Sequence, residues 1–140
     1  MTLAVRIVGY VLAAFMAFMG TQKFFGAVPI FQIIEDNLAA QWNVSAPWVE
    51  PWFKYFTGGL ELVSALLLVI GRRFAGGAMA LLVLVGAVVA HLTVLGVSTP
   101  MSNAPGAESS PVLFVMALAF LAMAAFVTWM SRRATVSPVG

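Results

Sequence analysis

The sequence predicts an all-α integral membrane protein built as a four-helix transmembrane bundle. The 140 residues are 62% hydrophobic and 9% charged, with a mean hydropathy of +1.02, whereas soluble domains are about 45–50% apolar and 25% charged. Four apolar runs are long enough to cross roughly 30 Å of hydrocarbon. The arginines fall at the edges of those runs rather than along a polar face. We therefore expect residues 1–140 to form a single transmembrane domain.

The predicted spans cover, in order, residues 3–25, 56–71, 74–97 and 112–130. The first contains Arg6 near its start, where a long side chain can reach the membrane interface. The second is short, and apolar residues before it can extend it. A basic turn of four residues, Gly71 to Phe74, separates the second span from the third. Such a short turn makes these two helices antiparallel neighbours.

The long loop between the first two spans predicts a short amphipathic helix on the outer side. Apolar residues recur in it at helical spacing, at Ile30, Ile33, Ile34, Leu38 and Trp42. A helix of this kind lies on the membrane surface or covers the bundle as a lid. The aromatic residues of this region are expected near the outer interface, either as anchors or as the lining of a ligand entrance; they are Trp42, Trp48, Trp52 and Tyr55.

Loop charge predicts the orientation. With four spans, both termini share one side, and that side holds all the arginines: Arg6, Arg72, Arg73, Arg132 and Arg133. The opposite side holds Lys23 and Lys54. Because positive charge is enriched in cytoplasmic loops, we expect a multi-pass plasma (inner) membrane protein with both termini in the cytoplasm.

Composition also argues against several classes of function. The net charge is only +2 and no basic stripe exists, so no nucleic-acid partner is expected. The chain has no cysteine and one histidine, which makes a metal site, an iron–sulfur cluster or a dithiol centre unexpected. No nucleophile stands in a recognisable catalytic setting. The sequence thus favours a protein without autonomous catalytic activity.

Three ionisable side chains are expected at a similar depth in the outer half of the bundle: Lys23, Glu61 and His91. Glu61 is the most informative, since a charge near the centre of a membrane helix costs roughly 2.5–3.5 kcal/mol and normally faces the protein interior with a partner. One interpretation is an ion pair or hydrogen-bonded network that fixes helix register. The other is a polar floor for a ligand head group, or a proton-carrying site. Small residues on the same helices, Gly20, Gly58 and Gly86, are expected to permit close helix packing.

These residues stand in segments that resemble the DoxX and DoxX-like membrane proteins. The likeness runs from about residue 8 to residue 95 and rests on Gly20-Thr-Gln-Lys23, Gly58-Gly-Leu-Glu61, and Gly86 to Leu92. It implies a four-helix bundle in which Gly20, Lys23, Gly58 and Glu61 match the recurrent positions. It also implies a link to quinone-dependent oxidoreductases or to membrane complexes of oxidative stress.

Two classes of function follow as expectations. In the first, the chain is an accessory protein that binds a quinone or lipid-like molecule non-covalently at Lys23, Glu61 and His91 for a membrane redox or stress-response partner. In the second, it is an assembly or scaffold protein with neither ligand nor catalysis. A transporter ranks third, because 140 residues without an internal repeat would require an oligomer. The lipid bilayer is the expected partner in each case, and a homo-oligomer stays open.

Overall fold

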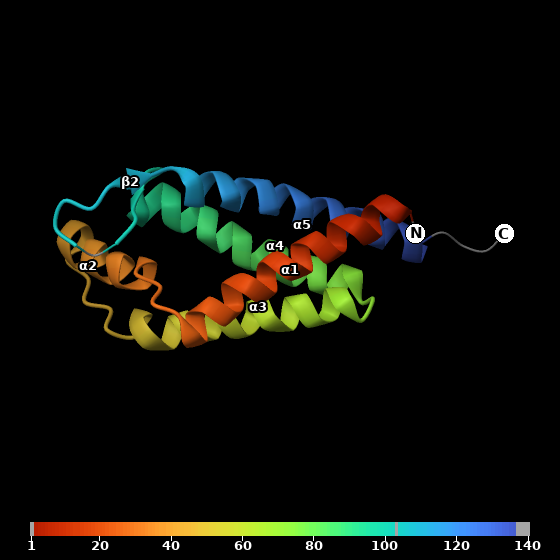
Figure 1. Ribbon diagram of the computed structural model, residues 1–140, viewed down its shortest axis with the longest axis horizontal. Helices are drawn as coiled ribbons and strands as arrows, with labels where there is room; N and C mark the ends of the chain where they lie inside the picture. The colour runs from red at the N-terminus through yellow and green to blue at the C-terminus, as the bar shows by residue number, and fades with distance from the viewer. Residues whose placement is uncertain (1, 103, 137–140) are drawn as a thin grey trace.

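The computed structural model is an elongated helical bundle and describes residues 2–102 and 104–136, with side chains through residue 133 (Figure 1). A π-helical turn at Val49–Phe53 leads into the helix Lys54–Val69, and a second one at His91–Leu95 continues the helix Arg73–Ala90. The elements in chain order are α1 (Leu3–Phe25), α2 (Ile30–Trp42), η1 (Val49–Phe53), α3 (Lys54–Val69), α4 (Arg73–Ala90), η2 (His91–Leu95), β1 (Thr99–Pro100), β2 (Ser109–Ser110) and α5 (Val112–Val136).

Four long helices pack as a ring in which α1 contacts α3 and α5, and α4 contacts α3 and α5. Figure 1 shows the start of α1, the last turns of α5 and the turn between α3 and α4 at one end, which we call the terminal end. The helix α2 and the short β1–β2 ladder lie at the other, which we call the capped end. The fold therefore separates the arginines, at the terminal end, from both lysines.

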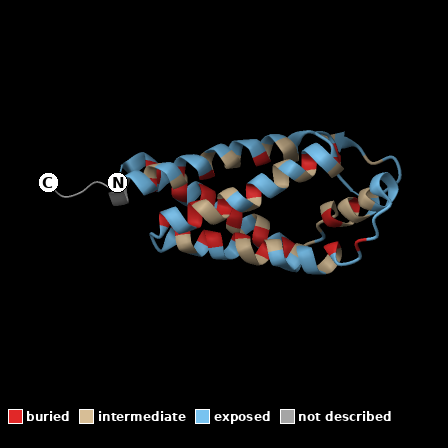
Figure 2. Cartoon of the chain, turned by 180° about the vertical axis from the view of Figure 1, so that it is seen from behind, coloured by how far each residue is buried: buried red, intermediate tan, exposed pale blue. Residues whose placement is uncertain are grey.

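Each of the four helices is long and apolar enough to cross a membrane. The candidate segments are Leu3–Phe25, Val49–Val69, Arg73–Leu95 and Val112–Arg133. Large apolar side chains cover their outward faces; Leu82 is 67% exposed and Phe18 is 59% exposed. Figure 2 shows these exposed faces surrounding a narrow buried seam. An apolar exterior of this extent is what a hydrocarbon solvent favours and water does not.

The seam is built from small and medium apolar residues, one set from each long helix. Against this seam, Phe15 of α1 stacks on Phe120 of α5 with ring centroids 3.4 Å apart. Alanines let the helices approach closely where no aromatic ring intervenes. The buried members are Leu12, Ala13, Met16, Ala65, Leu68, Ala80, Leu84, Ala124 and Val127.

The predicted segments correspond to these helices, with differences at their ends. The second begins earlier than predicted because η1 extends α3 back to Val49. The third ends at Leu95, since Gly96 has a φ of +79° and leaves the helical region. The turn before α4 is tight, as expected, and Gly71 supplies its positive φ of +88°. The loop after α4 contains the short antiparallel β1–β2 pairing.

The predicted amphipathic helix is α2, and it packs across the capped end. Its buried residues are Phe31 and Ile33, and Phe31 forms a small second core with Ala46 and Val49. The helix is tied to the end of the third span by a hydrogen bond of 3.0 Å from the Asn37 side chain to the carbonyl of Val94. Trp42 was predicted on the apolar stripe, but it is 59% exposed, because the helix ends there and its last turn projects beyond the bundle.

Candidate functional site

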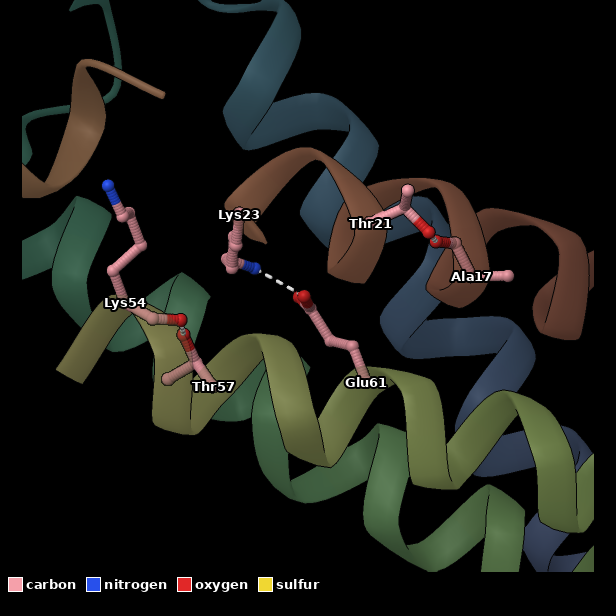
Figure 3. Close-up of polar contacts among 6 residues, drawn as sticks. All are labelled: Ala17, Thr21, Lys23, Lys54, Thr57 and Glu61. Atoms are coloured by element: carbon pink, nitrogen blue, oxygen red, sulfur yellow. Dashed lines mark hydrogen bonds and ion pairs between the residues drawn. The ribbon is translucent and has the colours of Figure 1, made fainter. Parts of the chain in front are cut away.

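The centre of the candidate site is an ion pair between Lys23 of α1 and Glu61 of α3. The ammonium of Lys23 donates a hydrogen bond to Oε2 of Glu61. Figure 3 shows the two side chains pointing toward each other across the space between the helices. Lys23 is 7% exposed and Glu61 is 5% exposed. The two residues predicted to meet inside the bundle therefore do meet.

Local backbone geometry explains why they meet. Gly20 and Gly58 bring α1 and α3 into direct contact, since a Cβ at Gly20 would lie 2.9 Å from the carbonyl oxygen of Gly58. The two helices run antiparallel, so Lys23 and Glu61, each three residues further along its helix, stand on opposite sides of that contact. Side chains in a helix tilt toward its N-terminus. Each charged side chain therefore leans back over the glycine contact toward the other.

The helix α2 covers the pair from the capped end. The ammonium nitrogen of Lys23 lies 5.7 Å from the ring centroid of Phe31, within the range of a cation–π contact. Phe31 is itself only 5% exposed, because it is held in the second core. The pair thus has an apolar lid whose own packing fixes its position.

The pair retains hydrogen-bonding capacity that the described protein groups do not use. A lysine ammonium has three donors, and only the one directed at Glu61 has a partner among the described residues. On the carboxylate, Oε1 has no partner in the described part of the chain. The arrangement can therefore bind a small polar group that accepts from Lys23 and donates to Glu61.

His91 belongs to a separate network. It is buried, and its Nδ1 lies 3.0 Å from the carbonyl oxygen of Gly96 and 3.2 Å from Oγ1 of Thr99. The ring makes an edge contact with Phe114 of α5, with centroids 5.6 Å apart. Among the described residues, no hydrogen bond or ion pair joins His91 to Lys23 or Glu61. The predicted trio is thus a pair plus a histidine that anchors the loop after α4.

The His91 geometry fixes the tautomer of the neutral ring. A carbonyl oxygen only accepts hydrogen bonds, so the nitrogen that contacts Gly96 carries the proton. The other ring nitrogen, Nε2, then has a lone pair and no partner in the described part of the chain. His91 can therefore accept a hydrogen bond or a proton at Nε2 while it keeps the loop in place.

Two open hollows lie on the surface of the described structure. One, of about 270 Å³, lies between α2 and the loop that follows β1, and Ile33, Asp36 and Asn37 line its helical side. The other, of about 280 Å³, is an apolar groove on α1 near Phe18 and Phe25. Neither is lined by Lys23, Glu61 or His91. Neither of these two hollows therefore provides a route to the pair.

The glycine prediction is right at two positions and wrong at the third. Gly20 and Gly58 form a close contact, but Gly86 is exposed, and a Cβ placed there would meet nothing within 4 Å. Gly86 therefore does not mediate helix packing within this chain. The close approaches of α4 are made instead by Gly76, against Leu68, and by Gly77, against Thr128. The sequence signal for these was available, since Gly76 and Gly77 are adjacent small residues in the first part of the predicted third span.

Comparisons with models of protein families, with curated proteins and with solved structures give no match. The resemblance to DoxX proteins thus rests on motif order and spacing. Within the described residues, no group of three or more acidic, histidine or cysteine side chains could hold a metal ion. The candidate site is accordingly defined by its own geometry, which is a covered Lys–Glu pair between two closely packed helices.

Proposed function

We propose that the chain is a DoxX-like protein that crosses the plasma (inner) membrane four times, with the terminal end in the cytoplasm. Four long apolar helices with exposed apolar faces support insertion. The segregation of every arginine to the terminal end supports the orientation. Exposed aromatic residues at the capped end, among them Trp48 and Trp52, are placed as interface anchors would be.

Within the membrane, the proposed function is that of an accessory protein that binds a quinone or lipid-like molecule for a membrane redox or stress-response complex. The observation that carries this proposal is the unused hydrogen-bonding capacity of the buried Lys23–Glu61 pair. Ligand sites in proteins combine an apolar lining with a few convergent polar groups. Lys23 would donate to a carbonyl or phosphate oxygen of the ligand, and Glu61 would orient the ammonium and accept from a hydroxyl.

No autonomous catalytic activity is assigned to the chain. Its side chains hold no electron carrier, since it lacks cysteine and its one histidine is engaged with the loop. Any redox chemistry therefore belongs to the ligand or to a partner protein. The role that remains for this chain is to hold the ligand's polar group at a fixed depth.

A second candidate is an assembly or scaffold protein in which the pair only locks α1 against α3. The observation that favours it is that Lys23 and Glu61 already contact each other and that neither of the two hollows reaches them. Under this alternative, α2 is a permanent cap and never moves to admit a ligand.

Binding measurements on the purified protein separate the two candidates. Wild type, Lys23→Met and Glu61→Gln are compared for binding of a short-chain ubiquinone by intrinsic tryptophan fluorescence, with Lys54→Met as the control that keeps the site intact. We expect binding by wild type and Lys54→Met, and a loss of about tenfold or more in the two site variants. Equal binding by all four folded proteins would refute the site. Native mass spectrometry of the gently purified protein identifies the bound molecule and the stoichiometry.

A further inference from the structure

A second polar site lies at the terminal end, where Arg73 of α4 is buried against α1. Arg73 is only 8% exposed, and its Nε has no hydrogen-bond partner among the described residues. The guanidinium carbon lies 5.4 Å from the ring centroid of Tyr10. A Cβ at Gly9 would lie 3.5 Å from Nε, so the arginine occupies the notch that this glycine leaves in α1. Arg73 therefore has an unused hydrogen-bond donor, Nε, next to Tyr10 and Gly9 of α1.

A second fully buried polar atom without a hydrogen-bond partner in the described part of the chain is Oγ of Ser131 in α5. Ser131 is 5% exposed. The register between the helices places it near the same level as Arg73, because a Cβ at Gly77 would lie 2.7 Å from Oγ1 of Thr128. One turn toward the terminal end from this contact leads to Arg73 on α4 and to Ser131 on α5. Two buried polar atoms that lack a hydrogen-bond partner among the described residues, Nε of Arg73 and Oγ of Ser131, therefore occur at a similar level on neighbouring helices.

The electrostatics of this turn favour an anion. The N-terminus of a helix carries partial positive charge and attracts acidic side chains. The first turn of α4 contains no acidic residue, and its N-cap, Arg72, provides no side-chain cap. Every acidic residue of the sequence instead belongs to α2, η1, α3 or the loop at the capped end. Two arginines at a helix N-terminus with no acidic side chain nearby among the described residues are unfavourable beside the positive end of the helix dipole unless an anion compensates.

We propose that Arg73, with Ser131, binds the phosphate group of an anionic phospholipid of the cytoplasmic leaflet. The planar guanidinium fork matches phosphate oxygens, which accept two hydrogen bonds from it side by side. Basic pockets between membrane helices on the cytoplasmic side are suited to anionic head groups. The proposal rests on the membrane insertion proposed above, and it is independent of any ligand at Lys23 and Glu61.

The matched control is the neighbouring arginine. Arg72 carries the same charge one residue earlier, but it is exposed. A general attraction of the basic end for anionic lipid would involve both residues equally. A built site requires the fork of Arg73 in particular, so Arg73→Lys, which keeps the charge and loses the fork, is the informative change.

The test is thermal melting of the full chain, delipidated in a neutral detergent and titrated with phosphatidylglycerol. We expect phosphatidylglycerol to raise the midpoint of wild type and Arg72→Lys, and the apparent affinity to fall about tenfold in Arg73→Lys. Phosphatidylcholine at the same concentration is expected to have little effect. An equal response to phosphatidylcholine, or equal losses in the two arginine variants, would overturn the proposal.

Two further arms identify the source of the phosphate and guard against misfolding. Inorganic phosphate is titrated in parallel, and a response equal to that of phosphatidylglycerol would assign the site to a free anion instead of a lipid.

If Arg73→Lys does not fold, Ser131→Ala is used, because it removes one hydrogen-bonding group and no charge. We expect several-fold weaker binding of phosphatidylglycerol by this variant, with an unchanged midpoint in its absence. Unchanged affinity would contradict the assignment.

Discussion

Gly20 of α1 lies directly against Gly58 of α3, and the ion pair of the candidate site closes over this contact. A Cβ at Gly20 would stand 2.9 Å from the backbone oxygen of Gly58. Because the helices are antiparallel, Lys23 and Glu61 approach the contact from its two sides. The spacing of three residues between each glycine and its charged residue therefore has a physical reason. The glycine sets the distance between the helices, and the charge one turn away reaches across it.

Gly20→Val is expected to destabilise the protein by about 1–3 kcal/mol, because the added methyl groups force two helix backbones apart. Gly86→Val is the matched control, since it makes the same change on an exposed helix face with open space around it. Melting in detergent measures both. We expect a clear fall in the midpoint for Gly20→Val only. Similar falls for both variants would mean that valine in a helix, and not the glycine contact, causes the loss.

Removing one partner of the buried pair is expected to be costly. Glu61→Ala leaves the Lys23 ammonium buried without a counterion, and losses of about 3–5 kcal/mol are typical of such changes. Glu61→Gln keeps an acceptor for the ammonium and should cost less. The control is Glu50→Ala, which breaks the more exposed pair between Glu50 and Lys54, where about 0–1 kcal/mol is expected. Equal midpoints for all three variants would show that the pair does not hold α1 against α3.

The double change Lys23→Met and Glu61→Leu is a separate prediction. It removes both charges together, so no unpaired charge remains inside the bundle. Replacing a buried ion pair by apolar side chains is often neutral or stabilising. We expect the double variant to melt above Glu61→Ala, and to lose ligand binding if the site is functional. A double variant less stable than either single change would contradict the view that the cost comes from an unpaired charge.

The sequence predicts the spans and the pair well because each depends on a local quantity. Hydropathy marks the four helices, and the expense of charge in an apolar run indicates that Glu61 faces a partner. The sequence predicts less well in which direction around its helix each side chain points. His91 has a depth similar to that of Glu61, but depth alone does not say which neighbour a side chain faces. In the structure it faces the loop after α4 and Phe114 of α5.

The same reason explains the incorrect expectation for Gly86. A glycine permits close approach only if its face of the helix meets another helix. On α4, Gly76 meets α3 and Gly77 meets α5, whereas Gly86 is exposed and meets neither helix. The helical stretch before Gly86 is apolar on all sides, so its hydrophobic pattern does not indicate which face is buried. The burial of Arg73 was not predicted for a related reason. A basic residue in a turn is normally exposed, and the notch at Gly9 that receives Arg73 lies on another helix, so the local sequence does not indicate it.

The tautomer of His91 is directly measurable. The contact with the Gly96 carbonyl requires a proton on Nδ1, so Nε2 of the neutral ring is expected to be unprotonated. The chain has one histidine, and nitrogen-15 spectra of the uniformly labelled protein therefore give one unambiguous pair of ring signals. A neutral ring with the proton on Nε2 would exclude the described contact. As a second readout, His91→Asn should preserve stability better than His91→Gln, since only the asparagine amide can replace the Nδ1 donor.

The orientation of the four spans can be tested with single cysteines, since the chain has none of its own. Ser102→Cys places a thiol in the exposed loop at the capped end, and Arg72→Cys places one in the exposed turn at the terminal end. If the terminal end is cytoplasmic, a membrane-impermeant maleimide added to intact spheroplasts should label only the cysteine at position 102. Position 72 should react after the membrane is permeabilised. The reverse pattern would invert the topology, and labelling of both thiols in intact spheroplasts would show that the helices do not span the membrane as proposed.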